Sequence, residues 1–73
     1  MSDNTTTVKL EKSPTELYKI IKFEGLASSG AEAKKFIADG QVKVNGETEL
    51  QKRKKIVAGD TITFADQTLN ITE

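Results

Sequence analysis

The side chains that most often carry out catalysis are absent from this sequence. Its 73 residues include no cysteine and no histidine, which removes the thiolate nucleophile, the usual general base and the commonest zinc ligands. An enzyme built from the remaining residues would need a pair of carboxylates or an activated lysine. The eleven acidic residues are scattered, however, and four of them are expected to cap helices (Glu16, Glu32) or to shape turns (Asp60, Asp66). We therefore predict a protein that is not an enzyme and that binds no metal ion and no cofactor.

Basic side chains provide the clearest chemical signal. The net charge of the whole chain is zero, yet residues 34–55 hold seven basic and three acidic residues, a local charge of +4. Four of these basic residues are consecutive, from Lys52 to Lys55. Phosphate binding requires a concentrated basic patch rather than a basic protein. On charge alone three interpretations remain: a surface for RNA or DNA, a surface for an acidic protein, and a solvated face.

Two short helices are expected before this basic segment. The stretch 13–16 (Ser-Pro-Thr-Glu) is typical of a helix start, with Ser13 as the cap, and the first helix should end at Gly25. Ser29 and Glu32 form a second capping box, and Gly40 is expected to end the second helix. By their spacing, the residues predicted to face the core are Leu17, Ile20 and Ile21, and then Ala33, Phe36 and Ile37.

The second half of the chain alternates as β-strands do. Residues 41–44 precede Asn45-Gly46, a strong hairpin signal because both residues tolerate positive φ. Residues 61–64 and 68–71 alternate in the same way, and Ile56-Val57 is expected to enter the core. The sequence therefore predicts an α+β domain, in which two short helices resembling a helix-turn-helix pack on a small and mainly antiparallel sheet.

The domain is expected to span residues 13–73. Residues 1–12 form either a tail or an edge strand, with 5–10 as the strand and 1–4 disordered. No apolar run approaches the roughly 20 residues of a membrane span, and the N-terminus is unlike a secretory signal. We expect a monomeric protein of the cytoplasm that has no membrane partner.

In a compact domain, the basic residues of the second helix, the first strand and the 52–55 run would be neighbours, and their charges would form one surface. Such a surface neutralises phosphates and releases counterions. The run contains no aromatic residue, so stacking on unpaired bases would depend on Tyr18 or Phe23, and Tyr18 is better explained as a half-buried residue at the helix edge. The composition therefore favours a structured or double-stranded RNA, recognised through its shape and backbone.

One pair of segments resembles a known family. Residues 40–46 (G-Q-V-K-V-N-G), followed at a distance by 57–62 (V-A-G-D-T-I), are similar to the S-four RNA-binding domain, named after the fourth protein of the small ribosomal subunit and also called the alpha-L motif. The resemblance covers about residues 15–64 and implies binding of structured RNA, such as ribosomal RNA. It implies RNA contacts from Ser29, Lys34, Lys35, Gln41 and Lys43, to which the charge run adds Lys52, Arg53, Lys54 and Lys55.

Three residues depart from the family pattern. Gly30 and Glu16 stand where members often have arginine, and Asp39 stands where a basic or neutral residue is common. These departures shift the expected contacts toward Lys34, Lys43 and the 52–55 run. A second resemblance, to ubiquitin-like sulfur carriers, fits less well because the chain ends Asn-Ile-Thr-Glu rather than Gly-Gly. The alternative to RNA binding is a protein-interaction module that uses the same basic face on an acidic partner.

Overall fold

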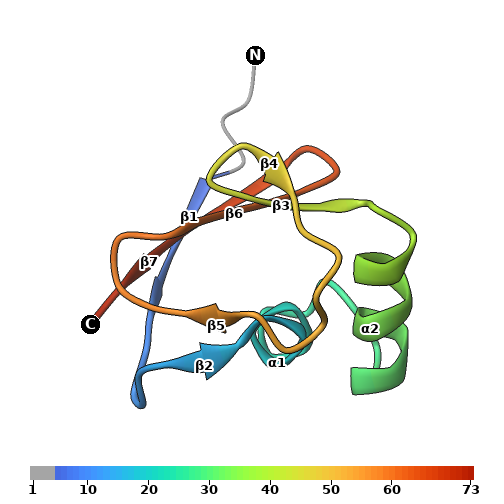
Figure 1. Ribbon diagram of the computed structural model, residues 1–73. Coiled ribbons are helices and arrows are strands. Elements are labelled where there is room, and N and C mark those ends of the chain that lie inside the picture. The colour runs from blue at the N-terminus through green and yellow to red at the C-terminus, as the bar shows by residue number, and fades with distance from the viewer. Residues whose placement is uncertain (1–4) are drawn as a thin grey trace.

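The computed structural model describes residues 5–73, in which two short helices lie beside a β-sheet (Figure 1). The helices are α1 (Leu17–Phe23) and α2 (Gly30–Ala38). Across the larger sheet the strands follow in the order β1 (Thr5–Lys9), β7 (Gln67–Thr72), β6 (Thr61–Phe64), β3 (Val42–Val44) and β4 (Glu47–Thr48). A smaller sheet pairs β2 (Thr15–Glu16) with β5 (Lys55–Ile56). The predicted α+β class is confirmed.

The strand pairing is antiparallel except at one edge. β3 pairs with β4 and β6, and β6 pairs with β7, all antiparallel, whereas β1 runs parallel to β7. Residues 5–10 were predicted to form either a tail or an edge strand. The edge strand is confirmed, and the tail is wrong. Residues 1–4, which were expected to be disordered, lie outside the described part of the chain.

The core lies between the helices and the inner face of the sheet. Leu17, Ile21 and Ile37 contribute from the helices, and Val42 and Ile62 contribute from β3 and β6; none of these five side chains is exposed. The alternation in β3 places Lys43 in solvent between two buried valines, as predicted. Removal of these apolar side chains from water is the main force that holds the small domain together.

The start of α1 differs from the prediction. The helix begins at Leu17, Glu16 is its N-cap without a side-chain hydrogen bond, and Ser13 lies outside it. Thr15 and Glu16 instead form β2. The free amides of Leu17 and Tyr18 donate to the backbone carbonyls of Lys54 and Lys52, at 2.9 and 3.2 Å. Because a distant segment satisfies these amides, the helix needs no serine cap, and local capping rules place its start incorrectly.

The second helix follows the prediction closely. The Ser29 hydroxyl accepts a hydrogen bond from the Glu32 amide at 3.1 Å, and Gly40 has a φ of 78° just beyond the helix. One inward residue differs, because Phe36 is only partly buried and packs against Phe64, with ring centroids 4.9 Å apart. Val57 also differs from the prediction: β5 ends at Ile56, and the Val57 side chain is 43% exposed.

The predicted hairpin turn is present at Asn45-Gly46, where both residues have positive φ. The Asn45 side chain also forms hydrogen bonds with residues outside the turn. The Asn45 amide donates to the Asp60 carboxylate at 3.1 Å, and its oxygen accepts from the Thr61 amide at 3.0 Å. Asp60 also accepts from the Val57 amide at 3.0 Å. These hydrogen bonds join the hairpin to the turn before β6.

Candidate nucleic-acid interface

The basic run 52–55 is fixed against the start of α1. Its backbone accepts hydrogen bonds from the first two amides of the helix, and Lys55 pairs with Glu16 across the small sheet. In Figure 1 the chain from β4 to β5 descends beside α2 and turns close to α1. All four side chains of the run are exposed. Because the backbone makes the attachment, the cationic groups remain available to a partner.

Tyr18 connects this run to α2. Its amide donates to the carbonyl of Lys52, while the Lys34 ammonium lies 4.6 Å from the centroid of its ring. A Cβ atom at Gly30 would lie 3.6 Å from the same ring, so the ring rests against the first turn of α2. Tyr18 is partly buried, as predicted, and it packs between the helices rather than presenting a free face. It brings Lys34 close to the run.

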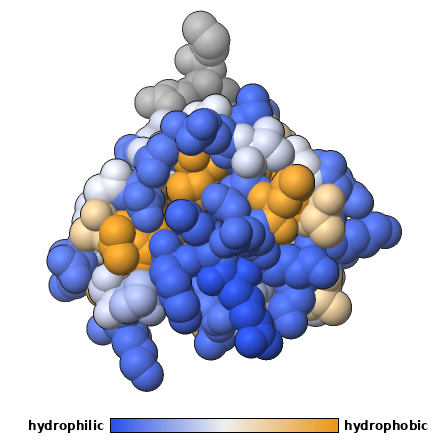
Figure 2. All heavy atoms as spheres, in the orientation of Figure 1, coloured by the Kyte–Doolittle hydropathy of each residue, from blue (hydrophilic) through white to orange (hydrophobic). Residues whose placement is uncertain are grey.

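We use the name basic surface for the five cationic residues gathered around Tyr18 and the start of α1: Lys34, Lys52, Arg53, Lys54 and Lys55. Figure 2 shows hydrophilic residues covering the part of this face where α1, β5 and the loop before β5 lie in Figure 1, with separate hydrophobic patches to either side. Like charges gathered on one face repel one another, so an anion that bridges them is stabilised. The chemistry of this surface suits phosphate groups.

Ser29 lies beside the basic surface, next to Gly30. Its hydroxyl already caps α2, and the Glu32 carboxylate accepts hydrogen bonds from the amide and hydroxyl of Ser28, at 2.8 and 3.2 Å. A carboxylate therefore stands at this helix end. A phosphate approaching Ser29 would meet that negative charge, which weakens the site compared with an uncapped helix start.

The remaining predicted contacts form a second group. Lys35 lies in the last turn of α2, the Gln41 amide donates to the Phe36 carbonyl at 3.1 Å just beyond that helix, and Lys43 lies on β3. All three side chains are exposed. In Figure 1 the start of β3 lies near the end of α2 that is distant from β5 and α1. The contacts around Tyr18 do not bring this group to the basic surface.

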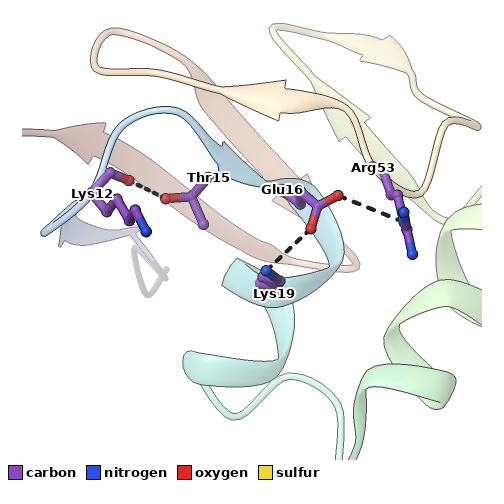
Figure 3. A network of polar contacts seen from close by, with 5 residues as sticks. All are labelled: Lys12, Thr15, Glu16, Lys19 and Arg53. Carbon is purple, nitrogen blue, oxygen red and sulfur yellow. Dashed lines mark hydrogen bonds and ion pairs between the residues drawn. The ribbon is translucent and has the colours of Figure 1, made fainter.

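An acidic residue lies at the edge of the basic surface. The Glu16 carboxylate is 3.2 Å from the Lys19 ammonium and 3.6 Å from the Arg53 guanidinium, and Figure 3 shows it pointing between the two. The Glu16 side chain is 17% exposed, whereas that of Arg53 is 72% exposed. The hydrogen bond from Lys19, together with the positive charges of Lys19, Arg53 and Lys55, lowers the pKa of Glu16 against the opposing effect of burial.

Only one of the two ion pairs of Glu16 could be expected from the sequence. Glu16 and Lys19 are three residues apart at the start of a predicted helix, a spacing that allows a side-chain pair. Arg53 is distant in sequence and reaches Glu16 only because the 52–55 run lies against α1. Glu16 was predicted to cap the helix with its side chain, and this role is wrong.

Residues 5–73 contain no group of three or more histidine, cysteine, aspartate or glutamate side chains that could hold a metal ion. Of the two turn acids predicted from the sequence, Asp60 accepts hydrogen bonds from the Asn45 side chain and from the Val57 amide. Neither helix in this part of the chain has the length and hydropathy of a membrane span.

Comparison with known proteins identifies the fold and its relatives. The S4 domain family matches residues 8–72. A protein of Escherichia coli K12 named "Putative RNA-binding protein YbcJ" is 50% identical over 66 residues, which cover 89% of this chain and 94% of the relative. YbcJ of Shigella flexneri, named as uncharacterised, matches to the same extent. The solution structure of E. coli YbcJ, described as revealing an alpha-L motif involved in RNA-binding, has a TM-score of 0.73 and 47% identity, covering 100% of this chain and 92% of that structure.

Proposed function

The chain belongs to the S4 domain family, and from this membership we propose that it binds RNA without catalysing a reaction. The description of the E. coli structure as an alpha-L motif involved in RNA-binding supports the proposal, since that protein is 47% identical and covers the whole of this chain. The absence of cysteine and histidine from the sequence agrees with a binding role rather than a catalytic one.

The observation that carries the proposal is the attachment of the 52–55 run to α1 through backbone carbonyls. This arrangement leaves four consecutive cationic side chains in solvent and places them beside Lys34. A disordered basic tail would also attract RNA, but it would pay a larger ordering entropy on binding. A cluster of charges on a backbone that is held in place suits a partner whose phosphates are themselves held at fixed positions.

That partner is a structured RNA, such as a ribosomal RNA helix. A folded RNA presents ordered phosphates and 2′-hydroxyl groups, which a protein reads by shape rather than by base sequence. In this proposal Lys34 and residues 52–55 bind phosphates, and Ser29, Lys35, Gln41 and Lys43 make contacts along the same RNA toward the far end of α2. The protein acts as a cytoplasmic monomer.

The test is a titration of the purified chain with a panel of folded RNA hairpins, followed by fluorescence anisotropy at low salt and at several higher salt concentrations. We expect tighter binding than millimolar at low salt and a linear fall of log affinity with log salt. An acidic protein partner would give the same salt dependence, so the RNA panel itself is decisive. If no hairpin binds more tightly than millimolar at low salt, the protein-interaction module becomes the better interpretation.

A pair of single substitutions locates the surface. Lys54→Ala removes a charge from the basic surface, whereas Lys22→Ala removes the same charge from an exposed position of α1 outside it. Loss of one phosphate contact should reduce the magnitude of the salt slope by about one. We expect this change for Lys54→Ala only, and equal slopes for the two variants would place the RNA elsewhere.

A further inference from the structure

A groove of about 690 Å³ lies between α1 and the segment that follows β1, and Lys55 is the one residue of its lining that the proposed function uses. Its lining includes the buried Leu10 and Ile20 side chains and, from the last turn of α1, Phe23. Phe23 is 71% exposed, more than any other large hydrophobic side chain in residues 5–73. An aromatic ring left in solvent beside a groove is available to stack on a flat ligand.

The charges around the groove favour an anionic ligand. Four lysines line it, at positions 9, 12, 19 and 55, against three acids, Glu11, Glu16 and Glu24. Glu16 is held between Lys19 and Arg53, so this one carboxylate faces two cations (Figure 3). The positive excess is small, and it is concentrated on the side where Lys19 and Lys55 adjoin the basic surface. The ligand therefore needs both an apolar part and a negative charge.

The geometry of α1 places these two requirements side by side. Lys19 and Phe23 are four residues apart, so they lie one helical turn apart on the same face. A cation and an aromatic ring in this arrangement match the phosphate and the base of one nucleotide. Tyr18 does not offer the same arrangement, because Lys34 and Gly30 contact its ring.

We infer that this groove binds unpaired nucleotides that adjoin the structured RNA, with a base stacked on Phe23 and phosphates at Lys19 and Lys55. The inference rests on the proposed function, because Lys55 belongs both to the basic surface and to the groove. An RNA strand that leaves a helix held on the basic surface can therefore pass from Lys55 into the groove, beside the Glu16 carboxylate that Lys19 and Arg53 hold. The protein would select a junction between paired and unpaired RNA rather than a continuous duplex.

The experiment compares two RNA probes with the full chain. One is a blunt hairpin of roughly 16 base pairs, and the other is the same hairpin with a short unpaired uridine extension. We expect the extension to tighten binding about tenfold, the effect of stacking one base. Phe23→Leu keeps an apolar side chain but removes the ring, so it should abolish the gain and leave the affinity for the blunt hairpin unchanged. Phe23→Trp should retain the gain.

Val57→Ala is the matched control, because Val57 is also an exposed apolar residue and does not line the groove. It should behave as the unmodified protein with both probes. If the extension adds no affinity, or if Phe23→Leu keeps the full gain, the groove does not bind unpaired RNA. These outcomes leave binding of the blunt hairpin, and thus the proposed function, intact.

Failure of the blunt hairpin to bind would instead contradict the proposed function. The groove is then tested alone, by recording the backbone amide NMR signals of Lys19 and Phe23 while a uridine oligomer is added. Movement of these signals supports a nucleotide site, and unmoved signals overturn it. If an oligoglutamate peptide moves them and the uridine oligomer does not, the groove accepts an acidic polypeptide and the inference is wrong.

Discussion

Two regions of this small domain have conspicuous sequences, and they differ in what holds them. The family-like segments 40–46 and 57–62 are joined to each other by the backbone pairing of β3 with β6 and also by side chains, through the hydrogen bonds of Asn45 and Asp60. The basic run 52–55 lies between them in sequence but is held by its backbone, which accepts hydrogen bonds from α1. In the first region the Asn45 and Asp60 side chains are used to build the fold, whereas the four basic side chains of the second region are exposed.

The comparison shows why a family pattern need not mark the binding residues. Asn45 and Gly46 supply the positive φ of the hairpin turn, and Asp60 fixes the following turn, so these residue types are needed for folding. Lysines attached through their backbone need only be long, charged and exposed. We therefore expect substitutions of Asn45 and Asp60 to change stability and substitutions in the basic run to change RNA affinity.

The strongest test of this division replaces Lys52, Arg53, Lys54 and Lys55 together with alanine. The main-chain hydrogen bonds to α1 remain possible, so the melting temperature should change little. If each exposed charge contributes about 0.5–1 kcal/mol, RNA affinity should fall roughly 30- to 1000-fold. Anisotropy with a folded hairpin measures the loss, and circular dichroism measures stability. Unchanged RNA affinity would show that the basic surface is wrongly assigned.

The next test addresses the first region. Asp60→Ala removes the acceptor for both the Asn45 side chain and the Val57 amide, at 3.1 and 3.0 Å. Losing these two hydrogen bonds should lower the free energy of unfolding by about 2–3 kcal/mol, measured by urea denaturation. At a temperature where the variant is folded, its RNA affinity should match that of the unmodified protein.

Asp39→Ala is the control for this substitution, because Asp39 is an exposed carboxylate at the end of α2. It should leave the free energy of unfolding close to that of the unmodified protein. A loss of RNA affinity in folded Asp60→Ala, without a loss of stability, would assign Asp60 to binding and contradict the division between the two regions.

How much of this structure the sequence predicts depends on how far apart along the chain the interacting residues lie. Local signals placed α2, its Ser29 cap and the Asn45-Gly46 turn correctly, because residues within one or two turns decide them. The start of α1 could not be predicted in this way, since Lys52 and Lys54 satisfy its amides from another part of the chain. The contact of Arg53 with Glu16 depends on the same packing, so only the Lys19 half of that cluster was within reach of sequence reasoning.

A substitution at Glu16 tests the basic surface without removing any of its cationic residues. Its carboxylate forms an ion pair with the Arg53 guanidinium, so an RNA phosphate must compete with Glu16 for Arg53. Glu16→Gln keeps the shape of the side chain and removes the charge, so RNA affinity should rise roughly two- to fivefold. Glu73→Gln removes an equal charge from the end of the chain and should give a smaller change. In an Arg53→Ala background the gain should shrink, and an undiminished gain would mean that Glu16 does not act through Arg53.

The smallest effect is a dependence of stability on pH. Because Lys19, Arg53 and Lys55 lower the pKa of Glu16 below its ordinary value of 4.5, the folded state favours the ionised carboxylate more than the unfolded state does. This contribution to stability is complete above that ordinary value and is lost as the pH falls through the lowered pKa. Urea denaturation from neutral pH to a pH of about 3 measures the free energy of unfolding of the unmodified protein and of Glu16→Gln. The difference between these two free energies should be constant near neutral pH and should narrow at the acidic end. Lys19→Met removes the closest cation and should reduce the narrowing, whereas an NMR titration midpoint for Glu16 at or above its ordinary value would show that the ion pairs do not stabilise its charge.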